Sequence, residues 1–168
     1  MENTRTLLVP VDFSQASAAA FEAALVLHGQ PGTTVVVLHV VDEAKVEFAI
    51  ELGYGMWKDV AAKSKNHAER AMRRLTDVEP PAGVEVRRVV SVGRPVLEIL
   101  RLAVELEADL IVIGSQTATA AEHAIFGSTA VRVLRAAHCP VLVIPGPAGS
   151  ARIDPPQDDA PSGAASAS

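Results

Sequence analysis

Short apolar stretches recur along the chain, separated by amphipathic or charged segments. These stretches are rich in Val, Leu and Ile, and most are continuous rather than alternating, which is typical of strands buried on both faces of a parallel sheet. Strands are predicted at residues 6–11, 33–41, 84–90, 110–113 and 141–144. The first strand ends at Asp12, and Gly114 is expected to end the fourth.

Between the strands, apolar residues recur at the three- and four-residue spacing of amphipathic helices. Helices are predicted at residues 16–27, 58–76, 95–107 and 128–137. Ser14 is a suitable N-cap for the first helix, and Pro95 fits the first turn of the third. Residues 43–60 lack a clear period and are expected to be partly helical, with Tyr54 and Trp57 packed locally.

The alternation of strands and helices predicts an α/β fold, with one doubly wound domain around a five-stranded parallel sheet. This domain is expected to cover residues 1–146. Residues 147–168 are rich in Pro, Ala and Ser, and they are expected to form a disordered tail because they offer little apolar surface to bury.

Composition narrows the class of protein. Hydrophobic residues make up 49% of the 168 residues but aromatic residues only 4%, so the core must be aliphatic. A formal net charge of −5 without a Lys/Arg-rich run argues against nucleic acid as a partner. The sequence contains no run of 18 apolar residues that would predict a membrane span. Pro10 and Asp12 interrupt the apolar stretch that a signal peptide would need, so a cytoplasmic location is expected. Cys139 is the only cysteine, and no Cys/His spacing indicates a metal site.

One stretch combines the elements of an anion site. The strand at 110–113 is followed by Gly114, a loop of small residues, and Gly127-Ser128-Thr129 at the start of a helix. The first amides of a helix have no intrahelical partner and lie at the positive end of its dipole, where they attract phosphate.

This spacing resembles the nucleotide motif G-x-x-G-x9-G-[ST] of the universal stress protein family. Gly114, Gly127 and Ser128 stand at three motif positions, and Thr117 stands where the motif has its second glycine. The resemblance extends over residues 4–145 through LLVPVDFS, VVVLHVVD, GRPVLEILRLAVELEADLIVIG and GSTAVRVLRAAHCPVLVIP. It implies a Rossmann-like sheet with strand order 3-2-1-4-5, as in adenine nucleotide alpha hydrolase-like folds.

The same resemblance implies a stress-response sensor or regulator that binds ATP or another adenine nucleotide, with or without Mg²⁺. The residues that would bind the nucleotide are Pro10, Val11, Asp12, Val40, Val41, Gly114, Ser115, Thr117, Gly127, Ser128 and Thr129. Asp12 would lie near the nucleoside, and the main chain at 40–41 would meet the base. The resemblance also implies a homodimer through strand 141–144 and a regulatory protein partner of unknown identity.

Alternatives stay open at this stage. Thr117 places a β-branched side chain where the motif has glycine, and the 115–130 loop contains no Lys or Arg, so a phosphate would depend on backbone dipoles unless Arg94 or His123 turns inward. Asp12 and Ser128 would also suit ordinary helix caps. A nucleotide-free, dimeric protein-interaction module is therefore the second hypothesis. A slow ATP hydrolase is the third, although no pair of residues indicates a base and a nucleophile, and the protein is not expected to be an enzyme.

Overall fold

A computed structural model of the chain describes residues 5–28, 30–115 and 127–146. The strands are β1 (Arg5–Pro10), β2 (Thr33–Asp42), β3 (Val84–Gly93), β4 (Leu110–Ser115) and β5 (Val141–Pro145). The helices are α1 (Gln15–His28), α2 (Glu43–Glu51), α3 (Trp57–Leu75), α4 (Pro95–Glu105) and α5 (Ser128–Ala136). All strand pairs are parallel, in the order β3-β2-β1-β4-β5, which confirms the predicted fold class.

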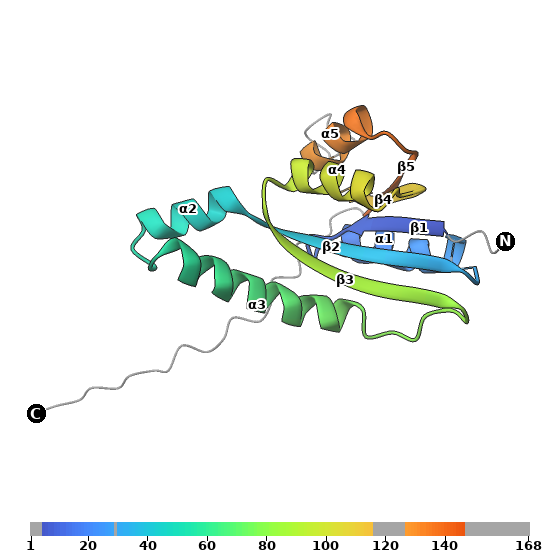
Figure 1. Ribbon diagram of the computed structural model, residues 1–168, viewed down its shortest axis with the longest axis horizontal. Coiled ribbons are helices and arrows are strands. Elements are labelled where there is room, and N and C mark those ends of the chain that lie inside the picture. Colours follow the sequence, from blue (N-terminus) through green and yellow to red (C-terminus); the bar gives the residue numbers. More distant parts are fainter. Residues whose placement is uncertain (1–4, 29, 116–126, 147–168) are drawn as a thin grey trace, which may run out of the picture.

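Helices cover both faces of the sheet (Figure 1). Because successive strand residues point to opposite faces, Leu7 packs with α1 and α3 whereas its neighbour Leu8 packs with α4 and α5. Both side chains are almost fully buried. This two-sided burial explains why the strand sequences are continuously apolar.

Gly114 does not end the fourth strand as predicted. β4 continues to Ser115, and Gly114 pairs with Ile144 of β5. The strand bears a glycine here because α1 crosses it closely: a Cβ on Gly114 would lie 2.4 Å from the carbonyl carbon of Ala16. Gly114 is therefore a packing residue inside the strand.

Residues 43–60 contain more helix than expected. Asp42 caps α2 by accepting a hydrogen bond from the amide of Ala44, and a turn at 52–56 connects α2 to α3. We call α2, this turn and the first half of α3 the arm. Figure 1 shows that the arm projects beyond the carboxyl ends of the strands. Tyr54 and Trp57 at its tip are exposed, so the prediction that they pack locally is wrong.

Several predictions concern residues that the structure does not describe. Thr117, His123 and the tail at 147–168 lie outside the described residues. Within the described part of the chain, none of the helices is both long enough and apolar enough to cross a bilayer.

Candidate functional site

The turn after β1 is held by local hydrogen bonds at the carboxyl edge of the sheet. The Ser14 amide donates to the Asp12 carboxylate at 3.1 Å, and the Ser14 hydroxyl accepts from the Ser17 amide at 3.2 Å, which confirms Ser14 as the N-cap of α1. Phe13 between them adopts a left-handed conformation with φ of 62°. The Asp12 side chain is exposed at this edge, and its carboxylate also has a local capping role.

A cavity of about 550 Å³ lies at the start of α5, and we call it the α5 cavity. It is lined by Asp42, Glu43, Ala44, Glu47, Arg94, Pro95, Val96, Leu97, Ser128, Thr129 and Arg132. These residues come from the end of β2, from the N-terminal halves of α2 and α5, and from Arg94 and the start of α4. The structure therefore places the predicted residues Ser128 and Thr129 in a hollow at the carboxyl edge, where ligands of doubly wound folds bind.

The first amides of α5 have no partner within the helix. The first intrahelical bond runs from the Val131 amide to the Gly127 carbonyl, so the amides of Ser128, Thr129 and Ala130 precede the hydrogen-bond ladder. Gly127 has no side chain that could cap them. The Gly127 amide itself donates to the Ser115 hydroxyl at 3.0 Å. Ser115 is buried, and its hydroxyl thus fixes the position of the helix start.

Two arginines supply positive charge to the α5 cavity. Arg94 directly precedes α4, and Arg132 lies one turn into α5. Arg94 lines the cavity, a position that the sequence left open, whereas Arg132 was not predicted. Two signals point to them: Arg94 follows the carboxyl end of β3, and Arg132 is four residues after Ser128 and so shares its helix face.

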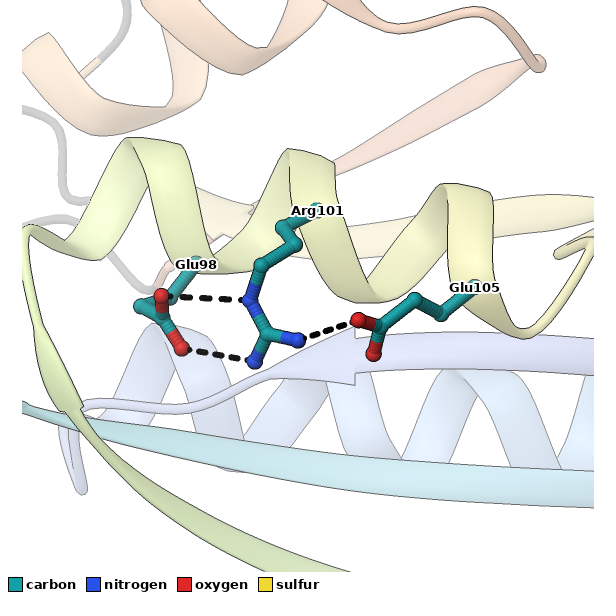
Figure 2. A network of polar contacts seen from close by, with 3 residues as sticks. All are labelled: Glu98, Arg101 and Glu105. Carbon is teal, nitrogen blue, oxygen red and sulfur yellow. Dashed lines mark hydrogen bonds and ion pairs between the residues drawn. The ribbon is translucent and has the colours of Figure 1, made fainter.

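The helix dipole of α5 is less compensated than that of α4. Arg101 of α4 lies between Glu98 and Glu105 and bonds to both (Figure 2). The hydrogen bonds from Arg101 lower the pKa of Glu98, which keeps this carboxylate ionised in the first turn of α4. A negative side chain there offsets the positive end of the helix dipole. α5 has no acidic residue in its first turn, all of which is described, so no carboxylate of that turn offsets the positive end of its dipole.

The other predicted residues that the structure describes do not line the α5 cavity. Val40 and Val41 line a neighbouring cavity on the α3 side of the sheet. Pro10 and Val11 are buried where β1 ends, with Pro10 in register with Leu38 of β2. α2 lies between the two cavities, because Glu43 and Glu47 line one and Val46 and Ala49 line the other. The predicted set thus meets at one edge of the sheet but is divided by this helix.

Comparison with known proteins identifies the family. Residues 3–145 match the sequence profile of the Universal stress protein family. The chain belongs to this family. Universal stress protein MJ0531 of Methanocaldococcus jannaschii is 30% identical over 143 residues, which cover 85% of this chain and 83% of that protein.

Solved structures of universal stress proteins share the fold. UspA of Lactobacillus plantarum superposes with a TM-score of 0.60 at 30% identity, covering 84% of this chain and 97% of that one. The archaeal protein MJ0577 superposes with a TM-score of 0.64 at 27% identity, over 84% of this chain and 96% of that one. An Arabidopsis thaliana family protein with AMP bound shares the fold at 17% identity, with a TM-score of 0.52 over 86% of this chain and 93% of that one.

Proposed function

We propose that this universal stress protein binds an adenine nucleotide at the carboxyl edge of its sheet and acts as a regulatory sensor in a stress response. The α5 cavity carries the proposal. It combines the first turn of α5, whose amides precede the hydrogen-bond ladder, with the guanidinium groups of Arg94 and Arg132. This combination suits phosphate, since backbone amides at a helix N-terminus and arginine side chains both donate to its oxygens.

The nucleoside would extend from the α5 cavity across the edge of the sheet. Asp12 lies there after β1, and the main chain of Val40 and Val41 lies beside it at the end of β2. Parallel strands bring these residues to one edge although they are far apart in sequence. Adenine nucleotide is the ligand class that the resemblance implies, and AMP is the ligand of the plant relative.

Carboxylates on the opposite wall favour a nucleotide whose phosphate charge is reduced by Mg²⁺. Asp42, Glu43 and Glu47 line this wall and would repel a free triphosphate. Among the described residues, no group of three His, Cys, Asp or Glu side chains is arranged to hold a metal ion. Mg²⁺ would therefore enter on the phosphate oxygens, as it does where substrate phosphates supply most of its ligands.

Mass spectrometry of the denatured, freshly purified protein tests the proposal. We expect a released adenine nucleotide, and we expect calorimetric titration of nucleotide-free protein to show tighter binding of ATP with Mg²⁺ than without it. If neither experiment detects a nucleotide, the protein is better described as a nucleotide-free interaction module.

We also propose that the protein is a homodimer joined through β5. β5 is the last strand in the sheet, and within the described residues its outer edge pairs with no other strand. Val141, Leu142, Val143 and Ile144 are apolar but only half-buried. An apolar edge strand with unpaired backbone groups is open to pairing with a second copy.

Val143→Lys is expected to convert the dimer into a monomer, because a charged side chain at the seam would lose its hydration on association. Sedimentation velocity would measure the change. Val86→Lys is a matched control, since Val86 is a half-buried residue on β3 at the other edge of the sheet. A Val143→Lys protein that stays dimeric, or a Val86→Lys protein that becomes monomeric, would place the interface elsewhere.

A further inference from the structure

The tip of the arm exposes a cluster of large apolar residues, which we call the tip patch. Its five members lie within ten residues of chain, and each is between 45% and 75% exposed: Phe48, Leu52, Tyr54, Met56 and Trp57. The whole chain has only six aromatic residues, and three of them are in this patch. Soluble proteins rarely expose a large apolar patch unless it binds something. The tip patch is therefore a candidate docking surface.

The fold holds the tip patch outward. Phe48 and Leu52 are one helical turn apart on the exposed face of α2, while Val46 on the opposite face is buried against the sheet. At the end of α2, the Gly53 amide donates to the Ile50 carbonyl at 2.8 Å, so the turn is fixed by backbone hydrogen bonds. None of the five patch residues lines the α5 cavity or the cavity that contains Val40 and Val41. A nucleotide at the edge of the sheet would thus leave the tip patch uncovered.

The exposed charges differ on the two sides of the tip patch. On α2, Glu47 and Glu51 are exposed beside the patch. On the first half of α3, exposed lysines outnumber the one exposed carboxylate, Asp59; these lysines are Lys58, Lys63 and Lys65. Within the described part of the chain, no ion pair involves any of these side chains. The arm thus presents carboxylates, then apolar and aromatic side chains, then cations.

The tail at 147–168 has the complementary order of residues. Arg152 precedes the pair Pro155-Pro156, and Asp158 and Asp159 follow it, with one further carboxylate at Asp154. A cation, two prolines and two carboxylates could therefore meet the carboxylates of α2, the aromatic tip and the lysines of α3 in turn. Proline-rich segments dock on aromatic surfaces, and their restricted backbone lowers the entropy cost of ordering them.

β5 ends at the same edge of the sheet from which the arm projects (Figure 1). The Gly146 amide donates to the Ser115 carbonyl at 2.9 Å, which fixes the point where the tail begins. β2 lies three strand spacings away, or about 15 Å, and the nine residues of α2 extend about 14 Å from its end. The ten residues from Pro145 to Pro155 span about 30 Å in the polyproline conformation, so the proline pair can reach the tip patch.

We propose that residues 152–159 dock on the tip patch of the same chain in a polyproline conformation, with Pro155 and Pro156 against Tyr54 and Trp57. The complementary charges set the direction of the segment along the arm, and contact with the proline rings removes apolar surface from water. Docking of this kind needs no folded core in the tail. It also covers a surface that the nucleotide does not use.

Trp57 is the only tryptophan of the chain, so its fluorescence reports on the patch directly. In the full-length protein, Pro155→Ser combined with Pro156→Ser should raise acrylamide quenching of Trp57 about twofold and shift its emission to the red, because the indole ring loses its apolar cover. Pro147→Ser is the control, since this proline is too close to β5 to reach the tip and its loss should change neither signal. Equal quenching in the wild type and the double variant would overturn the proposal.

A charge exchange tests the direction of docking. Lys58→Glu combined with Lys65→Glu should raise the quenching of Trp57 as the proline change does, because like charges then face Asp158 and Asp159. Adding Asp158→Lys and Asp159→Lys to that protein should restore the wild-type quenching. If the second pair of changes gives no recovery, the carboxylates do not lie along α3 and the proposed register is wrong.

Trypsin cleavage after Arg152 provides a readout that does not depend on Trp57. Docking should protect this bond, and Tyr54→Ser combined with Met56→Ser should speed its cleavage several-fold, since the patch loses two apolar contacts. Val26→Ser is the matched control, because Val26 is 81% exposed on α1 and away from the arm. Cleavage at the same rate in all three proteins would contradict docking.

The Val143→Lys protein shows which chain supplies the tail. Because the tail is proposed to dock on its own arm, both the protection of Arg152 and the low quenching of Trp57 should persist in this protein at every concentration. Loss of both in Val143→Lys, or on dilution of the wild type, would assign the tail to a second copy and overturn docking within one chain.

Discussion

Replacing Gly114 by alanine is expected to lower the free energy of unfolding by about 3 kcal/mol, at the upper end of overpacking costs. The added Cβ would lie 2.4 Å from the Ala16 carbonyl carbon, 2.5 Å from its oxygen and 2.6 Å from the Ser17 nitrogen. These are backbone atoms of the first turn of α1, and both residues are buried. A side chain could rotate away, but here α1 itself must shift from β4. Urea unfolding followed by circular dichroism would measure the loss.

Gly53→Ala provides the matched control. Gly53 has a φ of +83°, but a Cβ there would meet nothing within 4 Å. Its replacement should cost about 1 kcal/mol, which is the cost of a left-handed alanine without any steric clash. Equal losses at the two positions would show that the contact between β4 and α1 yields easily, and would contradict the packing argument.

The result also bears on the nucleotide motif. Gly114 is the first glycine of that motif. Loss of nucleotide binding in a Gly114 variant would therefore suggest that Gly114 contacts the phosphate. The structure gives another reason for the glycine, because a Cβ would displace α1. Nucleotide binding by Gly114 variants is therefore informative only after their stability has been measured.

Changing both Arg94 and Arg132 to serine is expected to weaken ATP binding about a hundredfold, since each ionic hydrogen bond to phosphate contributes roughly tenfold. Both side chains line the α5 cavity beside Ser128 and Thr129. The loss should be smaller for AMP than for ATP, because AMP carries less phosphate charge. Isothermal titration calorimetry in the presence of Mg²⁺ would measure both affinities.

Arg135→Ser is the control for this pair. Arg135 is exposed in the last turn of α5 and does not line the cavity, so its loss should leave ATP affinity within about twofold of wild type. Each Arg→Ser substitution removes one positive charge, so the comparison tests the position of the arginine rather than the loss of charge. If the double variant binds ATP as tightly as Arg135→Ser, the phosphates do not occupy the α5 cavity.

Much of the fold was predictable because burial on both faces of the sheet imposes continuous apolar strands. The two-sided core and the Ser14 cap agree with the sequence patterns, and the strand order agrees with what the family resemblance implied. The errors arose where the local pattern and the tertiary contact differ. Gly114 was expected to end a strand, as glycine often does, yet it continues β4 because α1 approaches closely. Tyr54 and Trp57 were expected to pack, yet they lie exposed on the arm.

The candidate site was predictable only in part. Ser128 and Thr129 could be identified from local sequence because a helix start has orphan amides wherever it occurs. The joint position of Arg94 and Arg132 could be seen only in the folded sheet, where the end of β3 and the first half of α5 line one cavity. These two segments are about forty residues apart in the chain, because parallel strands are joined by long crossover connections. The neighbouring cavity lined by Val40 and Val41 had no sequence signal, since its other lining residues are scattered over α2 and α3.

The sequence by itself determined the alternation of elements, the covered parallel sheet and the helix start that can bind an anion, because each follows from local periodicity and local hydrogen-bond supply. Only the tertiary structure decided that α2 divides the carboxyl edge into two cavities, with carboxylates and arginines in one and basic residues without carboxylates in the other. The physical reason is that charge and shape in a cavity depend on which side chains converge in space, and neighbours along the chain do not specify that convergence.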